Sequence, residues 1–215
     1  MNDHTTPESV EAVSAPRRSW TRWTGAMLRD LGNWLTRKPL KLPDGWLPIA
    51  HSSDVRLIVW AFAGTDLVSG FVIDAMLPPA GRAVHLLWLV FSLVLSLGFC
   101  AMTVRSPHLL DGRNLRLRTG PFRDLTIPAE VIGSARVAHG STHGHGLRRV
   151  PDEDGAVACT VGSATSLVID LDEPVLVRLR KGHPVLASRI YAAADRPGEA
   201  ARSISRSIAG GREGR

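Results

Sequence analysis

Two long runs of apolar residues lie near the middle of the chain, and they have the length of membrane spans. The second run, 83–104, has 22 residues without an Asp, Glu, Lys or Arg. A helix of that length covers roughly 30 Å, the thickness of the hydrocarbon core of a bilayer. We therefore expect 83–104 to cross the membrane as a helix, because lipid offers its backbone no hydrogen-bond partner.

The first apolar run, 55–77, contains an acidic residue. Asp66 lies near its centre, where an Asp costs about 2.5–3.5 kcal/mol on insertion scales. Only 78–82 separates the two runs, so we expect them to insert together as an antiparallel hairpin. In that hairpin the depth of Asp66 matches Ser92 and Ser96. Two interpretations stay open: Asp66 is satisfied within the hairpin, or it serves a proton path or a subunit contact.

Basic residues flank both runs on one side. Arg37, Lys38 and Lys41 precede the first run, Arg56 lies at its start and five basic residues follow the second run, whereas the connecting segment has only Arg82. The positive-inside bias predicts a multi-pass protein of the plasma or inner membrane with both termini in the cytoplasm.

The segment before the spans changes pattern twice. Residues 1–16 are polar and are predicted to be a disordered tail. Over 17–38 apolar residues recur at spacings of three and four, which predicts an amphipathic helix, and a proline-rich linker, 39–54, follows it. The helix has a basic rim, so we interpret it as lying in the headgroup region; a helix packed on the C-terminal domain or on a partner is the alternative. Its tryptophans are Trp20, Trp23 and Trp34.

After the second run the dominant period is two, which is typical of β-strands. Leucine alternates with arginine over 115–118, and a turn is expected at 172–174 between two further strands. The period returns to that of a helix after Asp195. We predict a small α+β roll over 106–210, with six or seven antiparallel strands and one C-terminal helix, and a short tail at 211–215.

Three stretches of this region are LLDGRNLRLRTGPFRDLTIPAEVIGSARV, SLVIDLDEP and DRPGEAARSI. Together with the preceding hairpin they resemble the bacterial pleckstrin-homology-like (PH-like) membrane proteins, in particular the actinobacterial type with two spans before the domain. The resemblance covers 106–210 and the hairpin. It implies a PH-like roll with a scaffold or binding role and no catalysis.

Some pleckstrin-homology domains bind phosphoinositides with a basic-x-basic pair on an early strand. Arg116 and Arg118 resemble that pair, with Arg113 nearby; a solvated strand face is the other interpretation. Arg148 and Arg149 form a second basic pair, which we interpret as a contact for a partner.

The second basic pair belongs to a glycine-rich segment, 139–155, that we expect to be a mobile surface loop. Its histidines, His139, His143 and His145, offer imidazole groups to a metal, but the glycines would not hold them in place and no metal is predicted. The two cysteines of the chain, Cys100 and Cys159, are expected to be reduced and structural.

The net charge and the motifs of the chain limit the classes of function that we expect. There are 26 Lys and Arg against 20 Asp and Glu, and the net charge of +6 suits an anionic membrane surface or an acidic partner. The basic residues are not clustered with aromatic ones, so nucleic acid is not expected. No spacing places a nucleophile beside a base, which predicts a protein without catalytic residues or a cofactor.

The sequence thus favours a non-enzymatic membrane protein that presents a PH-like domain to protein partners at the cytoplasmic face, among membrane lipids. Homo-oligomers are compatible with it. Two alternatives stay open: an accessory subunit of a transporter or ion-coupled complex, and a module that binds anionic lipid headgroups.

Overall fold

The structure is a computed structural model, and it describes residues 11–14, 20–120, 122–179 and 184–213. The chain divides into two compact units. A helical unit consists of Arg18–Lys41 and Ser52–Ser106, and a β-rich unit combines Met1–Arg17, Leu42–His51 and Pro107–Arg215. The β-rich unit therefore collects chain from both sides of the predicted hairpin.

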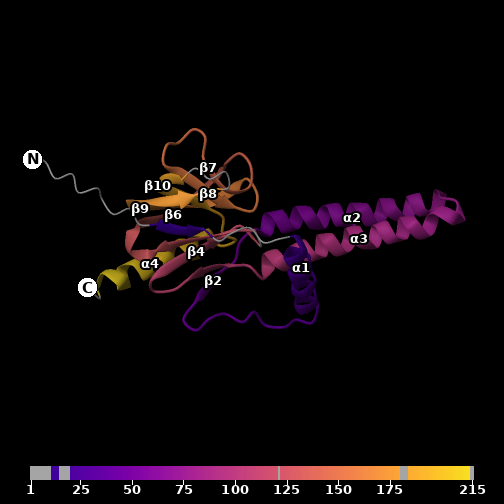
Figure 1. The fold of residues 1–215 in the computed structure, drawn as a ribbon, viewed down its shortest axis with the longest axis horizontal. Coiled ribbons are helices and arrows are strands. Elements are labelled where there is room, and N and C mark those ends of the chain that lie inside the picture. The colour runs from indigo at the N-terminus through magenta and orange to yellow at the C-terminus, as the bar shows by residue number, and fades with distance from the viewer. Residues whose placement is uncertain (1–10, 15–19, 121, 180–183, 214–215) are drawn as a thin grey trace, which may run out of the picture. The chain divides into compact units, whose positions relative to one another are not determined.

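The helical unit contains three helices, α1 (Trp20–Leu35), α2 (Ser53–Met76) and α3 (Pro79–Val104). The last two form the expected hairpin, and both are long and apolar enough to cross a membrane. They run side by side (Figure 1) and approach closely at Gly70, where an added Cβ would lie 2.7 Å from a methyl carbon of Leu89. Helix α3 begins four residues earlier than predicted, because a proline is well suited to the first turn of a helix.

Most of the hairpin surface consists of exposed apolar side chains. Only 11% of the most apolar stretch of α2 and 28% of that of α3 are buried. The exposed residues include Leu57, Phe62, Phe71, Met76, Leu87 and Trp88. A helix in the core of a water-soluble protein would be mostly buried, so this pattern is different from that of a core helix.

Helix α1 packs against the C-terminal half of α3 (Figure 1). Ala26 and Met27 form a small apolar cluster with Met102. The contact is close, since a Cβ added at Gly98 would lie 2.6 Å from Cγ of Met27. Arg105, which follows α3, donates to the carbonyl of Lys38, just after the end of α1, at 2.8 Å. The apolar face of the predicted amphipathic helix therefore contacts the hairpin itself, which neither interpretation of the sequence included.

The β-rich unit is built on a sheet with ten strands among the described residues. The strands are β1 (Glu11–Ser14), β2 (Leu47–Ile49), β3 (His108–Leu110), β4 (Asn114–Arg118), β5 (Asp124–Pro128), β6 (Ile132–Ser141), β7 (Gly146–Arg149), β8 (Ala156–Thr160), β9 (Ala164–Arg178) and β10 (Pro184–Ala192). Their order is β2-β3-β4-β5-β1-β9-β10-β8-β7, and β6 also pairs with β9. A short 3-10 helix, η1 (Ala129–Val131), precedes β6, and α4 (Pro197–Glu213) packs against both.

The core of this unit follows the alternation of the sequence. Leu115 and Leu117 of β4 are buried, whereas Arg116 and Arg118, which alternate with them, are only partly buried. Helix α4 buries the face that its period predicted, with Ala200, Ile204 and Ile208 in the same core. A hairpin of two long helices and a small β domain with a C-terminal helix are thus present.

The predicted roll differs from the structure in its strands. Instead of six or seven antiparallel strands over 106–210, eight strands lie there, and β8 pairs with β10 in parallel. Two more strands come from segments predicted to lack structure: β1 from the tail 1–16 and β2 from the linker 39–54. Residues 1–10 lie outside the described residues. At the other end, α4 continues through Glu213 into the predicted tail.

The turn predicted at 172–174 is wrong, because the 15-residue strand β9 runs through it. The pairing of β9 with β10 explains how Pro174 is accommodated within the strand. Val175 pairs with Ala187 and Asp170 pairs with Arg189, so four residues of β9 lie opposite Ser188 alone. At such an irregularity Pro174 has no ladder hydrogen bond to supply, and the strand can bend from one part of the sheet to the other.

Candidate functional site

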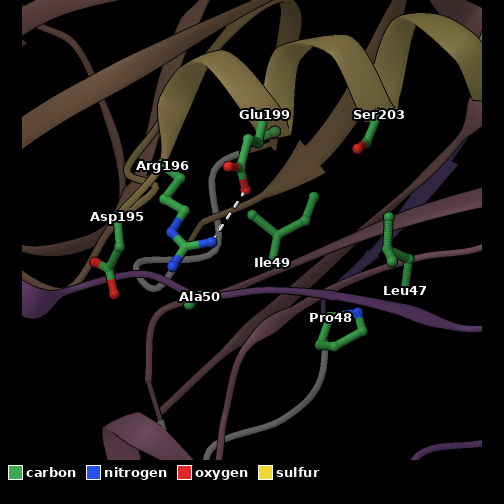
Figure 2. A pocket seen from close by; sticks show the side chains of 9 residues that line it. Leu47, Pro48, Ile49, Ala50, Asp195, Arg196, Glu199 and Ser203 are labelled. Atoms are coloured by element: carbon green, nitrogen blue, oxygen red, sulfur yellow. Dashed lines mark hydrogen bonds and ion pairs between the residues drawn. The ribbon is translucent and has the colours of Figure 1, made fainter.

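A pocket of about 500 Å³ opens in the β-rich unit between strand β2 and the first turns of α4 (Figure 2). Apolar residues of the strand line one side and polar residues at the start of the helix line the other. The lining residues are Leu47, Pro48, Ile49, Ala50, Asp195, Arg196, Glu199, Ala200 and Ser203. The pocket therefore combines an apolar wall with groups of both charges.

A hydrogen bond and the burial of Ile49 fix the strand side of the pocket. The N–H of Asp195 donates to the carbonyl of Ala50 at 2.9 Å, which ties the end of the strand to the start of α4. Ile49 is buried in the main core, whereas Leu47 on the same strand is 48% exposed. On the helix side Arg196 and Glu199, three residues apart, form an ion pair at 3.4 Å (Figure 2). Both side chains are well exposed, so this pair contributes little to stability.

The outer edge of β2 is poorly suited to pairing with another strand. The strand has three residues, Pro48 has no N–H to donate, and the carbonyl of Ala50 already accepts from Asp195. Short length and proline protect sheet edges from strand addition. A peptide ligand would therefore contact this pocket mainly through side chains and not through backbone pairing with β2.

The predicted headgroup-binding arginines lie together on β4, but they share an acidic neighbour. Arg116 donates from Nε to Asp124 Oδ2 at 3.0 Å, and Nε of Arg118 lies 3.9 Å from the other carboxylate oxygen. Arg113, in the preceding turn, is exposed. Asp124 offsets part of the positive charge, so this surface is less basic than the sequence indicates.

Arg148 has a structural role that the sequence prediction did not include. Its guanidinium donates to the carbonyl oxygens of His143 at 2.7 Å and Gly146 at 2.8 Å, and to Thr160 Oγ1 at 3.1 Å. Burial lowers its pKa. It therefore holds the β6–β7 connection from within, whereas Arg149 is exposed and pairs with Asp154.

The prediction of a mobile loop over 139–155 is wrong for much of that segment. Strand β6 extends to Ser141, and β7 (Gly146–Arg149) pairs with β8. His143 and His145 are exposed in the turn between these strands. Within the described part of the chain, no group of three or more His, Cys, Asp or Glu side chains is arranged to hold a metal.

An ion-pair network on β9 and β10 was not predicted. Arg189 donates to Asp170 and to Glu153, both at 2.5 Å, and Tyr191 donates its hydroxyl to Glu153 at 2.6 Å. Burial acts to raise the pKa of Asp170, but the hydrogen bonds and charges of Arg189 and Arg136 outweigh it and lower that pKa. The bond to Glu153 raises the pKa of Tyr191, and the two carboxylates raise that of Arg189.

Buried groups in the same unit carry further pKa shifts. His108 donates from Nε2 to the carbonyl of Ala193 at 2.9 Å, and its Nδ1 accepts the N–H of Arg118 at 2.8 Å, which fixes a neutral ring. Burial and the neighbouring His51 hold the pKa of His108 well below its usual value. Burial also raises the pKa of Cys159 to about 12, in agreement with a structural thiol. Two neighbours of His108, His51 and Ala193, are remote in sequence, so no local pattern could have revealed them.

Asp66 of the hairpin accepts a hydrogen bond from Ser92 Oγ at 3.0 Å, the partner that the antiparallel arrangement predicts. Among the predicted interface tryptophans, Trp23 packs on the α1–α3 cluster and Trp34 is half-buried. The side chain of Trp20 lies outside the described residues.

Comparison with protein-family models, with curated proteins and with solved structures finds no match to this chain.

Proposed function

We propose that this chain is a non-enzymatic membrane-anchored protein that presents its β-rich unit to a protein partner at the cytoplasmic face of the cell membrane. The observation that carries the proposal is the contrast between the two units. The α2–α3 hairpin exposes apolar side chains along its length, whereas the β-rich unit encloses its own core and carries the mixed pocket between β2 and α4.

The anchor follows from the cost of the exposed apolar surface. Phe62 and Phe71 are 68% and 62% exposed, and they lie on different sides of α2. Full burial of such a side chain is worth about 1.5–3 kcal/mol, and the hairpin exposes many of them. Lipid removes this cost. The basic flanks of the hairpin favour cytoplasmic termini, which would put the β-rich unit on that side.

The binding role follows from the β2–α4 pocket. Leu47 and Pro48 offer an apolar contact, and Arg196 and Glu199 offer one charge of each sign at the rim. This combination suits an apolar side chain of a partner flanked by polar or charged residues. Because the strand edge is blocked, side-chain recognition accounts for the specificity. The resemblance to bacterial PH-like domains agrees with such a scaffold role.

The headgroup-binding alternative is less favoured, because Asp124 offsets the charge of Arg116 and Arg118. The transporter-subunit alternative rests on Asp66, which is bound to Ser92. Anchoring gives a weak protein contact an advantage, since a partner in the same membrane is present at high effective concentration.

The test is photo-cross-linking in cells with a benzoylphenylalanine at position 47 of the full-length chain, followed by mass spectrometry. We expect one cross-linked protein that is lost when Ser203→Trp fills the pocket. The matched control is position 186, because Leu186 is 56% exposed on β10 and does not line the pocket. Equal patterns at 47 and 186 would contradict the pocket as a contact site. A C-terminal reporter found outside the cell would contradict the cytoplasmic orientation.

A further inference from the structure

Four polar side chains form a band on the surface of the helical hairpin near the middle of its length. Thr65, Asp66 and Ser69 are exposed on α2, and Ser92 lies beside them, half-buried on α3. We call these four residues the polar band. In the membrane-inserted hairpin of the proposed function, on which this inference rests, the band lies in the hydrocarbon core.

The hydroxyl groups of the band are satisfied within the hairpin. Thr65 Oγ1 donates to the carbonyl of Ala61 at 3.0 Å, and Ser69 Oγ donates to the carbonyl of Thr65 at 2.7 Å. Side chains that bond back to their own helix present a small surface, so another helix can approach closely.

Asp66 has more capacity to accept hydrogen bonds than the hairpin uses. Among the described residues its side chain accepts one bond, from Ser92. A carboxylate has room for about four, and an Asp in the middle of a span costs about 2.5–3.5 kcal/mol. A hydrogen bond between membrane helices returns about 0.6–2 kcal/mol, so Ser92 compensates only part of this cost.

The side of α2 next to Asp66 has the pattern of a helix-packing face. Exposed residues follow one another at spacings of four and three, with the smallest side chains in the middle; they are Ile58, Phe62, Thr65, Ser69, Val72 and Met76. A repeat of this kind keeps one side of a helix against a neighbouring helix. The stripe points away from Ala63 and Gly70, which are buried against α3.

We propose that the polar band is the interface between two copies of this chain in the membrane. Copies inserted in the same orientation place the same residues at the same depth, so each Asp66 meets the band of the other copy. In the dimer a hydroxyl that donates to its own helix in the single hairpin, such as that of Ser69, turns to Asp66 of the other copy, so each copy supplies an acceptor and a donor, as a two-fold interface requires. Such a dimer removes Asp66 from lipid and buries the stripe of α2.

The test uses the full-length chain in cell membranes and two single-cysteine additions, Ser69→Cys in the stripe and Phe71→Cys outside it. Position 71 is at nearly the same depth, about 200° further around the helix. The native Cys100 and Cys159 are buried and serve as background. With a short membrane-permeable bifunctional thiol reagent we expect at least about tenfold more dimer for S69C than for F71C, which corresponds to roughly 1.4 kcal/mol.

Asp66 is then changed in the S69C background. We expect Asp66→Leu to reduce the dimer at least fivefold and Asp66→Asn to retain it, because Asn still donates and accepts. Equal dimer yields for S69C and F71C would overturn the proposal, as would a D66L variant with unchanged dimer. Cross-linking of S69C to another protein only, which a basic partner helix would produce, would also overturn it.

Labelling with a water-soluble maleimide separates this inference from the proposed function. If both cysteines react in intact membranes, the hairpin is not inserted and the anchor fails. If both are protected and S69C gives no dimer, the dimer alone fails.

Discussion

The ring of His51 lies on the ring of His108, with centroids 4.1 Å apart and an angle of 13° between the planes. Both side chains are almost fully buried. His51 is two residues before α2 in the chain, and His108 follows α3 by four residues. The stack therefore joins, inside the β-rich unit, the segment that leaves for the hairpin and the segment that returns from it.

The stack predicts that the β-rich unit loses stability in mild acid. His108 resists protonation in the fold, whereas an unfolded His titrates near pH 6.5. Stability is therefore full above about pH 6.5 and falls as the pH drops below it, by up to about 1.4 kcal/mol per pH unit. The facing groups, His51 and Arg118, disfavour the charged ring, so neither reverses this sign. Denaturant unfolding of the purified full-length protein between pH 5 and 8 measures it.

Two variants attribute the pH dependence to this ring. His108→Gln keeps a donor for Ala193 but does not titrate, so we expect lower stability at pH 8 and a flatter profile. His145→Gln changes an exposed ring and should leave the profile as it is. If H108Q has the slope of the wild type, the acid sensitivity comes from another group.

Arg148 and Arg149 are adjacent, yet their replacement should have different effects. We expect Arg148→Met to reduce the free energy of unfolding by about 2 kcal/mol, because two carbonyl oxygens and one hydroxyl lose a partly buried charged donor. Arg149→Met should change it by at most about 0.5 kcal/mol, since its pair with Asp154 is exposed. Denaturant midpoints of both variants test this, and equal effects would contradict the internal role of Arg148.

The packing of α1 on α3 depends on the absence of a side chain at position 98. We expect Gly98→Val to displace α1, because its Cβ alone would overlap Met27. Hydrogen exchange of the amides in α1 should then be faster. Gly32→Ala is the control, since a Cβ there meets nothing within 4 Å. Unchanged exchange in G98V would show that α1 does not need this contact.

The Asp170–Arg189 pair predicts a second loss of stability of the β-rich unit, at lower pH. The pKa of Asp170 is lowered in the fold, so its contribution to stability is present above about pH 4, its unfolded value, and is lost as the pH falls below that. Both side chains are partly exposed, and we expect Arg189→Met to cost only about 1 kcal/mol at pH 7. Arg136→Met, which removes the longer 3.4 Å contact to the same carboxylate, should cost less. A larger loss for R136M than for R189M would contradict this ranking.

The sequence by itself determined the elements whose signal is local. Apolar length fixed α2 and α3, alternation fixed the buried leucines of β4, and a 3.6-residue period fixed the buried face of α4. It also placed Ser92 and Ser96 at the depth of Asp66, because the short turn of an antiparallel hairpin sets which residues lie opposite each other, and Ser92 is the one that donates to Asp66.

The tertiary structure alone decided what depends on distant partners. Strands β1 and β2 exist because β5, β9 and β3 offer them free edges, and their own sequences carry no strand signal. Pro174 reads locally as a turn, but an irregular pairing with β10 accommodates it within β9. The β2–α4 pocket and the His51–His108 stack likewise bring together residues that are far apart in the chain, because hydrogen bonds and burial act through space and leave no period in the sequence.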